Sequence, residues 1–178
     1  MMFISLGIGT VAALALIVVV SILTGGSTKS NNLATSALVG TTVKDFTLSG
    51  LNGGSERAPW TSGHAAVLIF FASWCGPCQS EMPKVATYLR AHPTGSIVVM
   101  GVDANDARGS AQAFVRKDGV AFPIASDPNG AVTTGIFQFA TVPETVFVNA
   151  RGVVTDVYFG AIPPSRLKTG IAALRAAA

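Results

Sequence analysis

The sequence is poor in residues that could bind a metal. Its 178 residues include only two cysteines, Cys75 and Cys78, and two histidines, His64 and His92. A closed tetrahedral zinc site needs four Cys or His ligands at matching geometry. Here one histidine lies in a Gly-flanked turn and the other directly precedes Pro93. The ligand set is incomplete, so we expect no metal.

Charge is also scarce. Charged residues make up 12% of the chain, and the net charge of +3 is spread along it. The sequence shows no basic run, no patch of basic and aromatic residues, no glycine-rich phosphate loop and no internal repeat. We therefore expect no nucleic-acid partner and no soluble cofactor.

One stretch lacks charge completely. Residues 3–23 contain no charged side chain, and residues 11–20 are almost purely aliphatic. A helix rises 1.5 Å per residue, so this stretch is long enough to span the roughly 30 Å core of a bilayer. No Lys or Arg precedes it, and its apolar core is longer than that of a cleavable signal peptide. We predict an uncleaved single-pass transmembrane anchor over residues 1–23, with a cleaved signal as the alternative. The single charge of Lys29 gives little information on orientation.

The predicted anchor is followed by a polar segment. Residues 24–38 are rich in Gly, Ser, Thr and Asn, a composition typical of a flexible linker. We place one folded domain after it, over residues 39–178.

Strands and helices alternate in this domain. Met82, Val85, Ala86 and Leu89 follow helical spacing and predict an amphipathic helix that ends before Pro93. A second helix is predicted over residues 111–116, and a third from a Ser165 cap to residue 174. We predict strands over residues 44–48, 67–71, 97–102, 122–125, 145–148 and 153–158, the last two forming a hairpin. The pattern indicates an α/β fold, a central mixed sheet covered by helices on both faces.

Both cysteines lie in the segment Trp74-Cys75-Gly76-Pro77-Cys78, directly after the buried strand predicted at residues 67–71. Two thiols separated by two residues at a helix start can cycle between dithiol and disulfide. A purely structural disulfide remains possible, although closing so short a loop constrains the unfolded chain little. A redox-active disulfide is the leading interpretation.

The motif suggests two different roles for its thiols. Cys75 would lie at the helix start, where free N–H groups and the helix dipole lower a thiol pKa, so it is the candidate attacking thiolate. Cys78, one turn further along, would be the shielded resolving thiol. Pro77 favours the first helical turn, and Gly76 leaves room for a second chain. Trp74 offers an apolar surface for substrate or, equally, for packing against the domain.

The motif and several other segments together resemble the thioredoxin superfamily. Within it, the chain is similar to the membrane-anchored TlpA/ResA-like thiol-disulfide oxidoreductases, and the resemblance covers residues 39–176. It implies a thioredoxin-like fold with an N-terminal strand extension in addition to the transmembrane helix. The segments that carry it, besides the Cys motif and the apolar N-terminus, are Asp45-Phe46-Thr47-Leu48, Glu81-Met82-Pro83, Phe122-Pro123, Asp127-Pro128 and Val142-Pro143-Glu144-Thr145.

The resemblance also implies roles for residues distant from the cysteines. The Val142–Pro143 bond would be cis, leaving the Val142 backbone free to pair with an extended substrate beside Cys75. Glu81 would accept the Cys78 proton if partly buried, which would raise its pKa toward neutrality. A solvated, helix-stabilising Glu81 is the alternative.

Three further positions complete the expected site. The buried Asp of thioredoxins proper is replaced by Ile69. Glu144 would lie at the rim of the site, and Pro83 would kink the active-site helix because it removes a backbone hydrogen bond.

By resemblance, the domain is extracytoplasmic and reduces disulfides in exported proteins. Apocytochrome c with Cys-x-x-Cys-His haem sites would be the substrate class, and a membrane-embedded thiol protein would supply electrons. The motif itself leaves the redox direction open. The alternatives are a thioredoxin-fold peroxidase, against which the absence of a Thr-x-x-Cys pattern argues, and a metal-delivery module using the cysteine pair.

Overall fold

The computed structural model describes residues 36–177. The predicted membrane anchor and most of the predicted linker lie outside these residues. Within residues 36–177, no helix combines the length and apolarity needed to cross a membrane.

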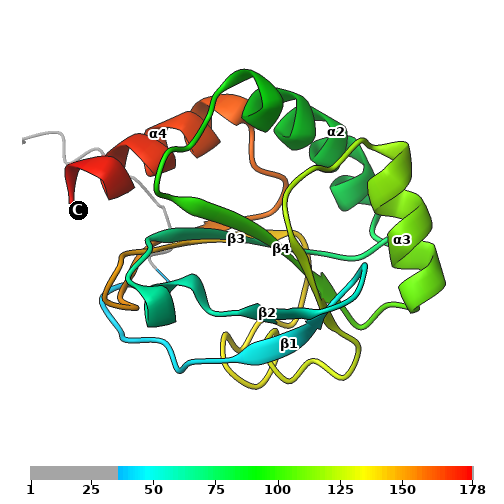
Figure 1. The fold of residues 1–178 in the computed structure, drawn as a ribbon, viewed down its shortest axis with the longest axis horizontal. Coiled ribbons are helices and arrows are strands. Elements are labelled where there is room, and N and C mark those ends of the chain that lie inside the picture. Colours follow the sequence, from blue (N-terminus) through cyan, green and yellow to red (C-terminus); the bar gives the residue numbers. More distant parts are fainter. Residues whose placement is uncertain (1–35, 178) are drawn as a thin grey trace, which may run out of the picture. The chain divides into compact units, whose positions relative to one another are not determined.

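In this described part of the chain, seven strands form one mixed sheet in the order β2-β1-β5-β4-β3-β6-β7. β4 runs parallel to both β3 and β5, and the remaining neighbours are antiparallel. The predicted mixed sheet is therefore confirmed. The elements, several of them labelled in Figure 1, are β1 Thr47–Gly50, β2 Ser55–Arg57, the 3-10 helix η1 Pro59–Ser62, β3 Ala66–Phe71, α2 Gly76–Ala91, β4 Val98–Ala104, α3 Arg108–Lys117, β5 Ile124–Asp127, β6 Glu144–Val148, β7 Val154–Phe159 and α4 Pro164–Ala176.

The central strand β3 explains how the sheet is buried on both sides. All six of its residues are buried, as its uninterrupted apolar sequence predicts. Because side chains alternate along a strand, Val67, Ile69 and Phe71 enter one apolar cluster, whereas Leu68 and Phe70 enter another. The two clusters define two faces of the sheet with different covers.

The first face, here called the helix-covered face, packs against α2, α3 and α4. Figure 1 shows α2 and α4 on this side of the sheet. Their apolar side chains, together with those of α3, join the same cluster as Val67 and Phe71: Met82, Val85, Ala111, Phe114, Val115, Leu167, Ile171 and Leu174.

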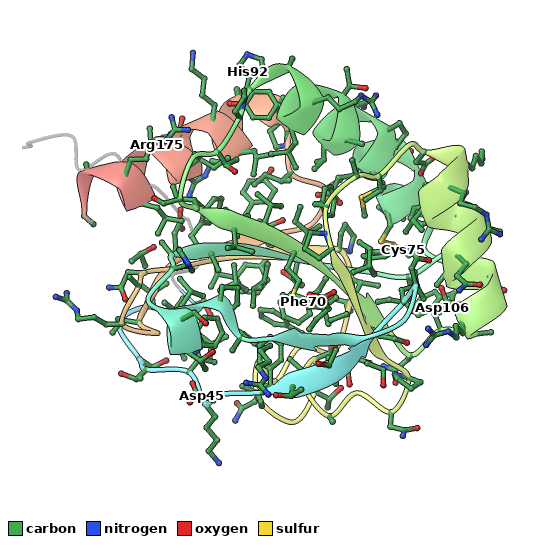
Figure 2. All side chains as sticks on the ribbon, viewed as in Figure 1. Asp45, Phe70, Cys75, His92, Asp106 and Arg175 are labelled. Carbon is green, nitrogen blue, oxygen red and sulfur yellow. A yellow bond between two sulfur atoms is a disulfide. The ribbon has the colours of Figure 1, made fainter. Side chains whose placement is uncertain are left out.

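The second face, here called the loop-covered face, is covered by η1 and by residues 131–139. Phe70 lies in the interior (Figure 2), with its ring centroid 4.9 Å from that of Phe137 and 5.1 Å from that of Phe139. Among residues 36–177, the helices on this face are limited to the short 3-10 helix η1, so the prediction of helices on both faces holds only in this reduced form. Residues 131–139 form successive hydrogen-bonded turns, which the Asp127 carboxylate holds by accepting the N–H groups of Val132 and Thr133 and the Thr133 hydroxyl.

Other predicted elements hold with local corrections. The β6–β7 hairpin is confirmed, and α2 continues unbroken across Pro83. Ser165 is not the cap of α4: Pro163 occupies that position and Pro164 begins the helix, where a missing N–H costs nothing. β5 begins at Ile124, two residues later than the predicted start at residue 122.

Candidate active site

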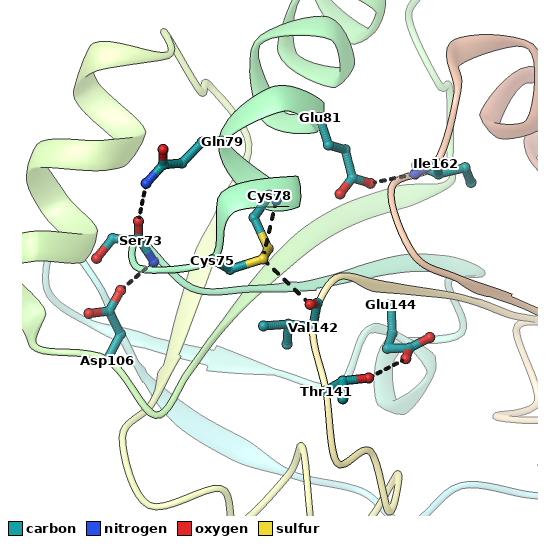
Figure 3. The surroundings of a disulfide bond; sticks show 10 residues. All are labelled: Ser73, Cys75, Cys78, Gln79, Glu81, Asp106, Thr141, Val142, Glu144 and Ile162. Carbon is teal, nitrogen blue, oxygen red and sulfur yellow. Dashed lines mark hydrogen bonds between the residues drawn. A yellow bond between two sulfur atoms is a disulfide. The ribbon is translucent and has the colours of Figure 1, made fainter.

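The two cysteines form a disulfide at the start of α2 (Figure 3). Cys75 is the N-cap residue, and its Sγ accepts the Cys78 backbone N–H at 3.2 Å. Cys78 is fully buried, and Cys75 is 3% exposed. Pro77 lies in the first turn, and a Cβ at Gly76 would meet no atom within 4 Å, so this side of the pair is open. The structure thus gives the sulfurs unequal surroundings, as the motif predicts.

The loop that presents Cys75 is fixed by hydrogen bonds. Asp106 accepts the Ser73 N–H at 2.6 Å, and the Gln79 side-chain amide donates to the Ser73 carbonyl at 2.9 Å. The Trp74 indole N–H donates to the Asn105 carbonyl at 3.1 Å, although 61% of the Trp74 residue is exposed. Trp74 is therefore held in one orientation on the surface. The sequence gives no signal for these contacts of Asp106 and Asn105, which depend on the fold.

The segment before β6 lies directly beside the cysteines. The Val142–Pro143 peptide bond is cis, which confirms the expectation. The Val142 carbonyl oxygen lies 3.4 Å from the Cys75 Sγ. Within residues 36–177, neither the N–H nor the C=O of Val142 makes a backbone–backbone hydrogen bond. This backbone edge is therefore available for pairing next to Cys75.

Glu81 lies on α2, on the helix-covered face of the sheet. The residue is 2% exposed, and its Oε1 accepts the Ile162 N–H at 3.0 Å, whereas its Oε2 has no partner among the described residues. Burial raises the pKa of Glu81 to about 7, partly offset by the bond from Ile162. The expected burial and near-neutral pKa are confirmed, and the solvated alternative is wrong.

Glu144 begins β6, and its side chain lies on the loop-covered face. It is 4% exposed, so its predicted place at the rim is wrong: pairing of β6 between β3 and β7 carries it into the interior. Its Oε1 accepts the Thr141 hydroxyl at 3.2 Å, and burial raises the pKa of Glu144 to about 7. In Figure 3, Glu81 extends from α2 toward Ile162, and Glu144 lies beside Thr141.

A third buried acid, Asp103, was not predicted. It lies near the end of β4, fully buried, and neither carboxyl oxygen has a hydrogen-bond partner among the described residues. Burial, and after it the neighbouring charges of Asp106 and Asp127, raise the pKa of Asp103 to about 7. An available signal was its position directly after the predicted strand at residues 97–102. At the position compared with the thioredoxin Asp, Ile69 is part of the apolar core.

The histidines lie away from this arrangement. His92 follows α2 at the end opposite Cys75, where its ring stacks on Tyr88 at 4.3 Å. In the described part of the chain, no group of three His, Cys, Asp or Glu side chains is placed to hold a metal ion.

Comparisons with known proteins agree with this geometry. The AhpC/TSA family matches residues 39–157, which include both cysteines and Val142–Pro143. The thiol-disulfide oxidoreductase ResA of Halalkalibacterium halodurans is 28% identical over 149 residues, 83% of this chain and 84% of the relative.

Two solved structures have the same fold. One is DsbF from MTB, in mixed oxidised and reduced forms: it is 32% identical, with a TM-score of 0.65 over 72% of this chain and 94% of that one. The other is a secreted Mycobacterium tuberculosis disulfide oxidoreductase homologous to DsbE of E. coli, 27% identical, with a TM-score of 0.63 over 72% and 96% of the two chains. The thioredoxin-like fold and the ResA-like resemblance are confirmed. The AhpC/TSA family matches residues 39–157, which are more than half of this sequence, so the chain belongs to that family.

Proposed function

We propose that this thiol-disulfide oxidoreductase is anchored in the cell membrane and reduces disulfides in exported proteins outside the cytoplasm. Apocytochrome c with Cys-x-x-Cys-His sites is the proposed substrate class, and a membrane-embedded thiol protein is the proposed electron donor. The uncharged residues 3–23 support anchoring, and the names of the ResA relatives support the enzyme class over a peroxidase or a metal-delivery module.

The observation that carries the proposal is the position of Cys75. Its sulfur caps α2, accepts the Cys78 N–H and lies 3.4 Å from the carbonyl oxygen of Val142. After reduction, the N–H and the helix dipole stabilise a thiolate at this position. The attacking group therefore lies beside a backbone edge that can align an extended polypeptide.

Reduction of a substrate then proceeds in two exchanges. The Cys75 thiolate attacks one substrate sulfur; the substrate disulfide breaks, a mixed disulfide forms, and the leaving thiolate takes up a proton. Cys78 next attacks the Cys75 sulfur, which releases the second substrate thiolate and forms the Cys75–Cys78 disulfide seen in the structure. Two electrons pass to the substrate, and the donor dithiol returns two electrons to the enzyme.

Glu81 supports the second exchange in this scheme. Cys78 must lose its proton before it attacks, and Glu81 follows it by three residues, on the same side of α2. A base with a pKa of about 7 is well matched to proton transfer near neutral pH. We assign Glu81 the role of proton acceptor for Cys78.

The exposed groups around Cys75 form the proposed substrate contact. Trp74 supplies an oriented apolar surface, Gly76 leaves space, and Pro77 presents no N–H that would need a partner. On the other side, Val142 offers its backbone groups and Pro143 directs the chain from this edge into β6.

Trapping of substrates tests the proposal. The full chain with Cys78→Ala, expressed in a membrane-bounded host, lacks the resolving thiol, so Cys75 should accumulate mixed disulfides with exported proteins. We expect proteins with Cys-x-x-Cys-His segments among them, identified by mass spectrometry after elution with reductant. The matched control, Cys75→Ala, should trap few. Efficient trapping by Cys75→Ala and none by Cys78→Ala would contradict the assigned roles.

A further inference from the structure

One buried carboxyl group near the end of β4 takes no part in the two exchanges. Asp103 is fully buried, and neither of its carboxyl oxygens has a hydrogen-bond partner among the described residues. Within residues 36–177 it also forms no ion pair. A buried polar group without a partner costs free energy, so its presence in a folded domain needs a physical reason.

The fold places Asp103 next to the start of the loop that leads to Cys75. β3 and β4 are parallel neighbours, and Asp103 is paired with Phe71, the last residue of β3. From these ends the chain continues through Ser73 on one side and through Asp106 on the other. The carboxyl ends of parallel strands meet at one edge of a sheet, and here a hydrogen bond from Ser73 to Asp106 joins the two loops.

Asp106 is the acceptor that fixes both loops. One of its carboxyl oxygens accepts the Ser73 N–H at 2.6 Å (Figure 3), and the other accepts the N–H of Ala107, the N-cap residue of α3, at 2.7 Å. Bonds this short are typical of an ionised carboxylate, and the dipole of α3 favours a negative charge at this end of the helix. A charged Asp106 therefore holds the residue two positions before Cys75.

The ionisable groups that act on Asp103 are acidic. Burial, and after it the charges of Asp106 in the adjoining loop and Asp127 on β5, raise the pKa of Asp103 to about 7. Its partners on β3 and β5, Phe71 and Ser126, are uncharged. Asp103 therefore keeps its proton at acidic pH and loses it to solvent near neutral pH.

The charged side chains of the two neighbouring helices are bound elsewhere. Arg108, the first residue of α3, donates to the Gly50 carbonyl at 2.9 Å. Glu81 of α2 accepts the Ile162 N–H at 3.0 Å. Neither bond changes when Asp103 gains or loses its proton, so the charge of Asp103 acts mainly on Asp106.

The protonation state of Asp103 thus bears on the loop before Cys75. While Asp103 is neutral, Asp106 can keep its charge and both of its N–H bonds. Ionised Asp103 would place a second negative charge beside Asp106 in a buried region, where like charges repel strongly. We infer that Asp103 is a positioning residue: its protonated form lets Asp106 hold the Ser73 N–H and fix the loop before Cys75, and its ionisation releases this loop. The inference rests on the proposed role of Cys75 as the attacking thiol.

Hydrogen exchange of the Ser73 amide tests the structural half of this inference. The full chain in detergent micelles is compared with its Asp103→Asn variant by NMR. Between pH 6 and pH 8.5, the protection factor of the Ser73 amide in the wild type should fall by at least about tenfold, because Asp103 titrates in this range. In Asp103→Asn, which has no proton to lose there, the protection factor should stay constant.

Single-turnover reduction of a peptide disulfide tests the catalytic half. The rate of Asp103→Asn should equal that of the wild type at pH 6 and exceed it by at least about tenfold at pH 8.5, because displacement of a reacting group slows reaction strongly. In an Asp106→Asn background, adding Asp103→Asn should leave the pH profile unchanged, since the effect passes through Asp106. A role of Asp103 in stability alone would not produce this pH-dependent ratio.

Asp118→Asn is the matched control. Asp118 is the C-cap residue at the other end of α3, and burial raises its pKa as well, so this variant should follow the wild type at every pH. Asp103→Ser replaces Asp103→Asn if the latter does not fold. Constant Ser73 protection in the wild type, or a wild-type pH profile in the folded Asp103 variant, would overturn the inference and leave the role of Cys75 standing. If Cys75→Ala reduces the peptide as fast as the wild type, the proposed role of Cys75 itself fails.

Discussion

The two faces of the sheet each bury one glutamate near the cysteines, and the two are attached to different parts of the site. Glu81 belongs to the same helix as Cys78 and accepts a backbone N–H from Ile162. Glu144 belongs to β6 and accepts the hydroxyl of Thr141, next to Val142. Burial raises the pKa of both to about 7.

Equal burial and equal pKa therefore do not imply equal roles. In the proposed mechanism Glu81 accepts the proton of Cys78, whereas Glu144 accepts the hydroxyl of Thr141 in the segment that approaches Cys75. The structural difference follows from the covers of the two faces: α2 carries both Cys78 and Glu81, whereas turns cover the face on which Glu144 lies.

The largest expected effect concerns packing of the two faces. Phe70 on the loop-covered face and Phe147 on the helix-covered face are both fully buried. Truncating either to Ala should lower the free energy of unfolding by about 3–5 kcal/mol, because each leaves a cavity. Urea denaturation of both variants checks this. A cost below about 1 kcal/mol for Phe70→Ala alone would show that the turns cover their face loosely.

The second effect separates the glutamates in catalysis. Glu81→Gln should slow the second exchange at pH 7 by about a hundredfold, because general-base help to Cys78 is lost. The wild-type rate should rise through a pKa near 7, and this limb should be missing in the variant. Glu144→Gln is the matched control, and its rate should still rise through a pKa near 7. Stopped-flow kinetics from pH 5 to 9 measure both, and equal losses in the two variants would refute the distinction.

The third effect is the pH dependence of stability. Because its pKa rises from 4.5 to about 7 on folding, Glu144 keeps a proton in the folded state that the unfolded chain releases. Its contribution to stability is therefore fully present below pH 4.5 and is lost as the pH rises to about 7. Glu144→Gln should be more stable than wild type at pH 8 by about 1–3 kcal/mol, with little difference at pH 4.5. Thermal unfolding at both pH values gives the answer, and the opposite trend would exclude the raised pKa.

The smallest effect concerns the packing of α4 against the helix-covered face of the sheet. A Cβ added at Gly170 would lie too close to the Phe147 ring, whereas one at Gly109 in α3 would meet nothing within 4 Å. Gly170→Ala should therefore cost about 1 kcal/mol despite its better helix propensity, and Gly109→Ala should not destabilise. Combining Gly170→Ala with Phe147→Leu should relieve the clash. A stabilised Gly170→Ala would place α4 further from β6.

The sequence was sufficient for elements whose pattern is local. The apolar run at β3, the helix after the cysteines and the β6–β7 hairpin were all predicted, because burial of their apolar faces decides their structure. β2 was missed because Ser55–Arg57 has no apolar alternation and depends on backbone pairing with β1. The cap of α4 was misassigned because a serine near a predicted helix start is a common cap, whereas here two prolines begin the helix.

The same distinction holds within the site. The cysteines, Glu81 and the cis-proline were identified because the motif and the resemblance mark them. The burial of Glu144 and the contacts of Asp106 and Asn105 were not, because residues distant in sequence create them. No element was predicted for the turns over the second face, since nothing in residues 131–139 reveals that Asp127 will accept their N–H groups.

The central claim is that Cys75 attacks and Cys78 resolves. The most direct measurement is the rate of iodoacetamide alkylation of each thiol in the reduced protein across pH 4 to 10, resolved by mass spectrometry of the peptides. The structure predicts that Cys75 reacts at least about tenfold faster than Cys78 at neutral pH, with a thiol pKa clearly below the usual value near 8.5. Equal labelling of the two thiols, or faster labelling of Cys78, would contradict the account.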